Sequence, residues 1–308
     1  MQLRVTSRGI AMLAFTAVVW GAMFAVAKSA LASIDAYWLS ALRYVPASLT
    51  MLVILWLVEG RKAWSFDGAF LTLWFRGTLG FAGFSILGYL GLARSRPEHA
   101  AIIVALLPLI GAMIGWLVHG RRPSRAVVLA MAIAFAGVVL VVSKGHWHAL
   151  FGGGLFADAL VLAGVVCWIG YTMGAQSLPQ FSTVRYTALS MALGTVSIVT
   201  ITLVATLAGA AHVPAMTVIA STGVDIAYLS LAAGVLAVLA WNGGIAALGT
   251  ANGFLFINLV PIVAFAIGIA QGRRFGPAEL AGALLVIGAL IASNLASRTP
   301  LARSPKFA

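Results

Sequence analysis

The feature that most constrains this chain is a succession of long apolar runs joined by short polar connections. A helix needs about 20 apolar residues to cross the hydrocarbon core of a bilayer, and many runs reach or approach that length. Ten runs are found, at residues 10–31, 38–58, 68–92, 97–118, 125–143, 155–177, 185–208, 223–247, 251–271 and 277–296. The sequence therefore predicts an all-α integral membrane protein with ten transmembrane helices.

Composition and charge exclude the main alternatives. Apolar residues (A, V, I, L, M, F, W, Y and C) make up 62% of the 308 residues, and charged residues make up only 8%. Soluble domains usually hold about 25% charged residues. The net charge of +12 does not indicate nucleic-acid binding, because the basic residues occur in pairs between apolar runs, as at Arg61-Lys62 and Arg273-Arg274. Such pairs are typical of loops beside anionic lipid, so we expect a lipid bilayer as partner and no nucleic acid.

The distribution of Lys and Arg predicts the orientation of the chain. If the N-terminus lies inside, the inner segments hold 11 of the 19 basic residues and the outer segments hold 5. Cytoplasmic segments carry the excess of basic residues in membrane proteins, so both termini are predicted to be cytoplasmic and the protein to lie in the inner (plasma) membrane. Ala25-Val26-Ala27 resembles a signal-peptidase site. The first run continues to about Leu31, however, so we expect it to remain as a span.

The sequence also repeats itself. The segment from Pro108 to Gly115 recurs as Pro261 to Gly268 at an offset of 153 residues, and Gly-Arg-Arg follows each copy. Five runs per half is an odd number, so the two halves must have opposite orientations, as in many secondary transporters. We therefore predict two inverted five-helix repeats, residues 1–144 and 145–308, joined by the glycine-rich stretch that ends at Gly154.

Several motifs are informative because the sequence lacks them. No G-x4-G-K-[ST] motif for ATP hydrolysis and no G-x-S-G motif of an intramembrane serine protease occurs. Cys167 is the single cysteine, so neither an intrachain disulfide nor a thiolate metal site can form. The five histidines lie in loops or near the ends of runs. We expect no cofactor, no metal site and no enzymatic activity.

The acidic residues bear on energy coupling. Carriers driven by protons or sodium usually hold a carboxylate at membrane depth. All seven acids lie at or near the ends of the runs: Asp35, Glu59, Asp67, Glu98, Asp158, Asp225 and Glu279. Transport is therefore predicted not to be coupled to protons.

Aromatic and amide side chains mark the candidate substrate site. Trp20 and Phe24 share a helix face at i, i+4 spacing, and Trp168 and Thr172 do the same in the second half, with Tyr171 one step round. Polar groups at membrane depth face protein or water rather than lipid. The same spacing also suits simple helix packing, so both interpretations stand. The candidate substrate-binding residues are Trp20, Tyr89, Trp168, Tyr171, Trp241, Asn242 and Asn258.

Prolines and small residues mark candidate hinges. Pro108 and Pro261 lie inside apolar runs, where each removes a backbone hydrogen bond and favours a kink. Gly111 and Gly115, with Gly268 in the second half, place small residues on one helix face, which allows two helices to approach closely. We assign these five residues to a hinge or packing role.

Three basic residues, Lys28, Arg43 and Arg76, lie inside apolar runs, and Lys28 and Arg43 are the best placed of them to be buried. Lys28 is near the end of the first run, and Arg43 is about five residues into the second. Each is interpreted either as an interfacial anchor, since long cationic side chains reach toward the headgroups, or as a group that meets the carboxylate of a ligand.

These residues together resemble the EamA family of the drug/metabolite transporter superfamily. The resemblance rests on two five-run halves, Trp20-Gly21 early in the first run, and the twin Pro-x6-Gly followed by Gly-Arg-Arg, and it covers nearly the whole chain. The aromatic-rich runs are most similar to YddG-type amino acid exporters. The resemblance implies a central cavity between the halves. The family usually ends the fourth and ninth spans with Gly-Glu, whereas this chain has Arg121 and Arg273, so the role of that glutamate cannot be transferred.

The sequence therefore predicts a secondary transporter that exports neutral and aromatic amino acids, or related small metabolites, by alternating access. The expected partner is a small-molecule substrate and the expected assembly is a monomer. A drug or nucleotide-sugar carrier of the same superfamily is the nearer alternative. A membrane-embedded enzyme is the more distant one, because it needs a cluster of buried acids or histidines that the sequence lacks.

Overall fold

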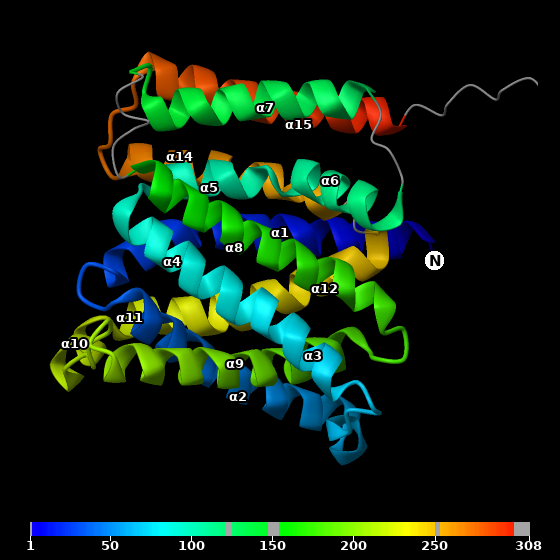
Figure 1. Cartoon of the computed structure of the whole chain (residues 1–308). Coiled ribbons are helices and arrows are strands. Elements are labelled where there is room, and N and C mark those ends of the chain that lie inside the picture. Colours follow the sequence, from blue (N-terminus) through cyan, green and yellow to red (C-terminus); the bar gives the residue numbers. More distant parts are fainter. Residues whose placement is uncertain (1, 121–124, 147–153, 250–252, 299–308) are drawn as a thin grey trace, which may run out of the picture.

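The computed structural model describes residues 2–120, 125–146, 154–249 and 253–298, and every regular element in these ranges is a helix (Figure 1). The first half contains α1 (Gln2–Ala30), α2 (Ala36–Glu59), η1 (Arg61–Trp64), α3 (Phe70–Gly77), η2 (Thr78–Gly83), α4 (Phe84–Arg94), α5 (Pro97–Ala105), α6 (Leu107–His119) and α7 (Arg125–Ser143). The second half contains α8 (Gly154–Gly174), η4 (Ala175–Ser177), α9 (Thr183–Leu207), α10 (Met216–Ser221), α11 (Gly223–Ala227), η5 (Tyr228–Leu236), α12 (Ala237–Leu248), η6 (Phe254–Asn258), α14 (Leu259–Ala270) and α15 (Pro277–Arg298).

Within the described residues, seven helical stretches are long and apolar enough to cross a membrane: Ser7–Ala30, Ala36–Glu59, Phe70–Arg94, Pro97–Leu117, Gly154–Gly174, Thr183–Leu207 and Gly223–Leu248. Three shorter apolar helices accompany them, at Val128–Val141, Phe256–Ala270 and Pro277–Ala289. The architecture is that of a multi-pass membrane protein. Gly152 and Gly153 of the expected joint, Arg121, and the first two residues of the run at 251–271 lie outside the described residues.

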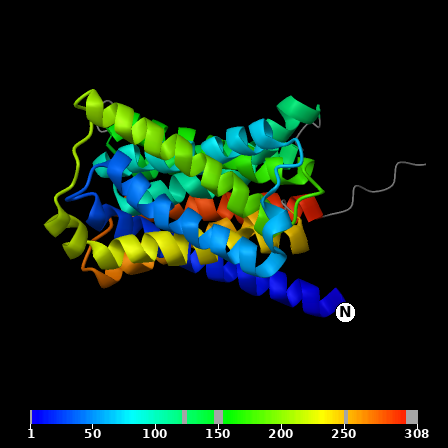
Figure 2. The same ribbon diagram turned by 90° about the horizontal axis from the view of Figure 1, so that it is seen from below.

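The helices run roughly side by side and pair across the two halves of the chain (Figures 1 and 2). α7 lies against α15, α2 against α9, and α5 against α14. α4 packs on α8, and α12 packs on α1. The start of α1 and the described end of α15 lie at the same end of the bundle (Figure 1). Each half of the structure therefore packs against helices of the other half.

Local breaks interrupt the helices at corresponding places. α5 ends at Ala105 and α6 begins at Leu107, immediately before Pro108, and η6 gives way to α14 shortly before Pro261. A proline nitrogen has no hydrogen to donate, so a continuous helix would lack one backbone hydrogen bond at each proline. Each break lies where that bond would be missing. The run predicted as one helix at 97–118 is thus two helices. π-helical segments, η2 and η5, also lie within the third and eighth runs.

Glycines let two helices cross at van der Waals distance. A Cβ atom on Gly77 of α3 would overlap the carbonyl oxygen of Ser190 in α9, and one on Gly194 would overlap the carbonyl oxygen of Gly77. Backbone atoms of two packed helices cannot move aside as a side chain can. These two glycines therefore set the distance between α3 and α9.

We expect Gly77→Ala to separate α3 from α9 and to lower the free energy of unfolding by about 1–3 kcal/mol or more, as overpacking does. Gly88→Ala in α4 is the matched control, because a Cβ there would have no atom of the described chain within 4 Å. Thermal unfolding of both variants in one detergent measures the difference. Equal melting temperatures for the two variants would show that the crossing is not tight.

Candidate functional site

Three tryptophans from three helices meet between the halves. Trp20 of α1 lies edge-on to Trp168 of α8, with ring centroids 5.3 Å apart, and its ring centroid is 5.2 Å from that of Trp241 in α12. Aromatic pairs at such distances are worth about 0.5–1.5 kcal/mol beyond their buried area. The three rings are buried, with exposed fractions of 8%, 3% and 0%. The structure thus brings together three of the residues singled out from the sequence.

Further rings extend this cluster along α8 toward α9. The ring centroid of Tyr171 is 5.1 Å from that of Trp168, and Tyr171 stacks on Tyr186 at 5.2 Å. Phe81 and Phe84 pack beside them, at 4.9 Å from Tyr171 and 5.3 Å from Trp168, respectively. We call these residues, with the three tryptophans, the aromatic cluster. The sequence reasoning missed Phe81, Phe84 and Tyr186, because rings of this kind are common on apolar helices and nothing in their spacing distinguished them.

Amide and hydroxyl groups form a short network at one side of the cluster. The Asn242 side-chain amide of α12 donates to the Tyr171 hydroxyl at 2.9 Å and to the Thr187 hydroxyl at 2.8 Å. The Tyr186 hydroxyl donates to the Tyr171 carbonyl at 2.8 Å. The network therefore ties α8, α9 and α12 together at the level of Tyr171.

The indole N–H groups differ in what they bind. Trp20 Nε1 donates to the carbonyl oxygen of Ala233 at 3.2 Å. Trp168 Nε1 and Trp241 Nε1 are buried and have no hydrogen-bond partner among the described residues. Buried polar groups without a partner are rare and costly. These two N–H groups are therefore candidates to donate to a ligand.

A small cavity lies against the cluster. Its volume open to the centres of water molecules is about 20 Å³, enough for about one water. The lining includes Trp20, Phe24, Arg43, Phe84 and Trp168, together with residues of α5, α6, α12 and η6. A cavity of this size does not admit an amino acid, so the structure is closed at this level.

A larger pocket opens at one end of the bundle, beside the network. It measures about 400 Å³ and is lined by residues of α9, α12 and the segment that follows α8, including Leu178, Tyr186 and Asn242. Asn242 and Tyr186 thus face this pocket and also bond Tyr171. Because Tyr171 packs on Trp168, this network separates the pocket from the small cavity.

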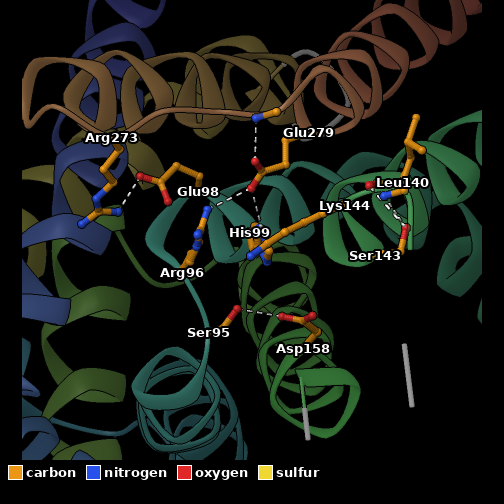
Figure 3. Close-up of polar contacts among 12 residues, drawn as sticks. Ser95, Arg96, Glu98, His99, Leu140, Ser143, Lys144, Asp158, Arg273 and Glu279 are labelled. Carbon is orange, nitrogen blue, oxygen red and sulfur yellow. Dashed lines mark hydrogen bonds and ion pairs between the residues drawn. The ribbon is translucent and has the colours of Figure 1, made fainter. Parts of the chain in front are cut away.

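Ion pairs cover the opposite end of the bundle (Figure 3). Arg273, between α14 and α15, binds Glu98 of α5 with an N–O distance of 2.6 Å, and Arg96 binds Glu279 of α15 at 3.0 Å. Lys28 donates to the carbonyl oxygens of Leu92 and Ala93 at the end of α4, both at 2.9 Å. These bonds tie Lys28 to the end of α4, and they test neither the interfacial anchor nor the contact with a ligand carboxylate that the sequence suggests.

The two carboxylates of these ion pairs are buried although they lie at helix starts. Glu98 is 1% exposed and Glu279 is 5% exposed. Glu98 Oε2 has no partner among the described residues, while Glu279 Oε2 accepts from the backbone N–H of Gly276 at 2.9 Å. Their positions near span ends agree with the sequence analysis. Their ion pairs with arginines some 175 and 183 residues away were not foreseen.

A loop at the pocket end also joins the halves. Asp67, which follows η1, accepts from the Ser65 hydroxyl at 2.6 Å and pairs with Arg185 of α9 at 2.7 Å. The hydrogen bond from Ser65 and then that from Arg185 hold the pKa of Asp67 below its ordinary value. Asp67 is about half exposed, so the pair contributes little to stability.

The remaining predicted residues lie as follows. The Tyr89 hydroxyl accepts a hydrogen bond from Arg43, and Asn258 is buried at the end of η6 with no partner for Oδ1 among the described residues. A Cβ on Gly111 would press on the Phe254 ring, and one on Gly268 on the Glu98 carboxylate. A Cβ on Gly115 would meet no atom of the described residues within 4 Å, so Gly115 marks no close helix contact in that part of the chain.

Comparisons with known proteins agree with this picture. The profile of the EamA-like transporter family matches residues 7–143. The chain is 33% identical to the uncharacterized transporter YrdR of Bacillus subtilis, over 91% of this chain and 88% of the relative. It is 24% identical to a probable terminal-alkyne amino-acid exporter of Streptantibioticus cattleyicolor, over 92% and 93% of the two chains.

The fold also matches that of a solved protein. A crystal structure superposes with a TM-score of 0.65 at 17% identity and covers 94% of this chain and 99% of its own. At this identity the match bears on the fold alone. The relatives are named as transporters, which confirms the prediction that the chain is not an enzyme. The chain belongs to the EamA-like transporter family of membrane proteins.

Proposed function

We propose that this protein exports neutral and aromatic amino acids, or closely related metabolites, across the inner membrane by alternating access. The observation that carries the proposal is the small cavity walled by Trp20 and Trp168, one from each half of the chain, where a buried indole N–H has no partner. The rings provide stacking surface for an apolar side chain, and a ring face attracts a substrate ammonium group. The relative named as a probable amino-acid exporter supports the same substrate class.

The proposed architecture is ten spans in two inverted repeats, with both termini cytoplasmic. The helix pairs support it. When the two halves are exchanged, the third run, which contains α4, takes the place of the eighth, which contains α12. The sixth run, which contains α8, takes the place of the first, which contains α1. The packed pair α4–α8 thus corresponds to the packed pair α12–α1. The breaks before Pro108 and Pro261 and the π-helical segments η2 and η5 correspond under the same exchange.

In the proposed cycle, the two halves rock about the cavity. The pocket beside Asn242 is the route from the cytoplasm, and the Tyr171–Asn242–Thr187 network is the barrier on that side. The ion pairs of Glu98 and Glu279 close the outer side. The breaks near Pro108 and Pro261, with the close contacts of Gly111 and Gly268, are the places where a helix bends or slides.

Topology is the first prediction of this proposal. Reporter fusions are expected to place residues 60–67 and the C-terminus inside, and residues 94–97 outside. The physical reason is the excess of Lys and Arg in the segments assigned to the cytoplasm. Termini on opposite sides of the membrane would contradict both the ten spans and the inverted repeat.

Counterflow in proteoliposomes tests the substrate class. Vesicles loaded with unlabelled phenylalanine are expected to take up labelled phenylalanine, chemically unchanged and without an ion gradient. Competition by amino acids, nucleotide sugars and cationic drugs then ranks the three substrate classes. Exchange that only a nucleotide sugar or a drug inhibits would replace the proposal with that carrier. Uphill accumulation driven by protons alone would overturn the lack of proton coupling, and Glu98 would be the first residue to examine.

A further inference from the structure

Arg43 is a buried cation at the wall of the small cavity. It lies in α2, and its exposed fraction is 2%. The cavity wall also contains Trp20, Phe24 and Trp168. A charge at membrane depth is costly, and such side chains usually face the protein interior or a cavity and pair with an opposite charge. An opposite charge beside Arg43 is therefore expected.

The partners of Arg43 are neutral. Its Nη1 donates to the Tyr89 hydroxyl at 2.8 Å, and its guanidinium lies over the rings of Tyr44 and Tyr89, at 4.7 and 5.8 Å from their centroids. Nε is buried without a hydrogen-bond partner, and no carboxylate in the described part of the chain forms an ion pair with Arg43. Ring faces attract a cation, but they do not neutralise its charge.

The buried Asp158 carboxylate likewise has a neutral partner, the Ser95 hydroxyl, but the two buried glutamates are paired with arginines. Glu98 has Arg273 and Glu279 has Arg96. The second half also lacks a counterpart of Arg43. Tyr89 and Asn242 are related by the offset of 153 residues, and each forms a hydrogen bond with the preceding long helix of its own half. The partner of Tyr89 is the cation Arg43, whereas the partner of Asn242 is the neutral Thr187. The uncompensated positive charge is therefore confined to one side of the cavity.

We infer that Arg43 binds the carboxylate of the substrate. This inference rests on the proposed function and names the group that the site requires. A guanidinium presents N–H donors in a planar fork that matches a carboxylate. With the carboxylate at Arg43, the side chain of an amino acid lies against Trp20 and Trp168. The site thus selects molecules that carry a carboxylate and rejects the corresponding amines.

Binding of three small probes separates these requirements. The probes are phenylalanine, 3-phenylpropionate, which keeps the carboxylate but lacks the ammonium, and phenethylamine, which keeps the ammonium but lacks the carboxylate. Ligands that bind only the folded protein raise its melting temperature. Purified wild-type protein is expected to be stabilised by phenylalanine and 3-phenylpropionate, and not by phenethylamine. Stabilisation by phenethylamine alone would overturn the inference.

The variants are Arg43→Gln and Arg43→Lys, with Lys28→Gln as the matched control. Lys28 is another cation inside an apolar run, but its ammonium is already bound by two carbonyl oxygens. Arg43→Gln is expected to weaken binding of 3-phenylpropionate at least tenfold, which is about 1.4 kcal/mol, and Arg43→Lys to weaken it less. Lys28→Gln is expected to leave the preference for a carboxylate unchanged.

The melting temperature without ligand distinguishes a binding role from a structural one. Arg43→Gln removes a charge that no carboxylate balances, so its melting temperature is expected to equal or exceed that of the wild type. If Arg43→Gln fails to fold, Arg43→Lys keeps the positive charge and measures only the effect of losing the planar set of guanidinium donors. Wild-type affinity for 3-phenylpropionate in the folded variant would overturn the inference. Carboxylate binding by the wild type without amino acid exchange would leave the role of Arg43 intact and refute the proposed function.

Discussion

Trp168→Ala is expected to lower the free energy of unfolding by about 3–5 kcal/mol, the usual cost of removing a fully buried tryptophan, and to abolish exchange of aromatic amino acids. Trp168 contacts Trp20, Phe84 and Tyr171 and is 3% exposed, so alanine leaves a cavity that rigid rings cannot fill. Thermal unfolding and counterflow on the same preparation measure the two effects. Unchanged exchange would remove Trp168 from the site.

A pair of phenylalanine variants separates packing from ligand binding. Trp168→Phe and Trp20→Phe remove the same volume, but only Trp20 loses a hydrogen bond within the protein, the one to the Ala233 carbonyl. A hydrogen bond contributes about 0.5–1.5 kcal/mol. We therefore expect Trp20→Phe to melt at the lower temperature. Trp168→Phe is expected to weaken phenylalanine binding by about two- to twelvefold. The opposite order of melting temperatures would contradict this assignment.

Arg273→Ala is expected to destabilise the protein by about 3–5 kcal/mol, because it leaves a carboxylate buried without its counter-charge. Glu98 is 1% exposed, whereas the Arg273 side chain is 34% exposed. Glu98→Gln is therefore expected to cost less, since the freed Arg273 can turn toward water. The double variant is expected to melt close to Glu98→Gln alone. A double-mutant cycle of thermal unfolding measures the coupling between the two residues.

Arg274→Ala is the control for this cycle, because Arg274 is exposed and lines, together with Arg273 and Arg96, a pocket of about 330 Å³ at the ion-pair end of the bundle. It is expected to melt within about 0.5 kcal/mol of the wild type, as most surface substitutions do. Equal destabilisation by Arg274→Ala and Arg273→Ala would mean that the positive charge of the pocket matters and the ion pair does not.

The part of the site that depends on helical spacing could be predicted from the sequence. Trp20 and Trp168 recur at related places in the two halves, and the structure brings them within 5.3 Å of each other. Pro108 and Pro261 predicted disruption of their helices, and a break precedes each of them. Both features depend on properties of a single helix. The spacing of side chains decides which residues share a face, and the missing backbone donor of proline disrupts the helix.

The contacts between distant helices could not be predicted. Glu98 and Arg273 are 175 residues apart, and nothing in their local sequence indicates that one faces the other. The sequence marks Arg273 as part of a basic pair and as a departure from the Gly-Glu of the family, and in the structure it is the partner of a buried carboxylate. The neutral neighbours of Arg43 could not be predicted either. A helix that is apolar on all sides has no sequence period that indicates which side faces the protein interior.

Labelling of single cysteines tests most directly the claim that this transporter opens alternately to the two sides. In a Cys167→Ala background, Ala246→Cys places a thiol in the pocket of about 400 Å³ and Arg274→Cys places one in the pocket of about 330 Å³ at the ion-pair end of the bundle. Membrane-impermeant thiol reagents are expected to reach Ala246→Cys from the cytoplasmic side only and Arg274→Cys from the outside only. Phenylalanine is expected to change the two labelling rates in opposite directions. Labelling of both positions from one side, or parallel changes with substrate, would contradict the account.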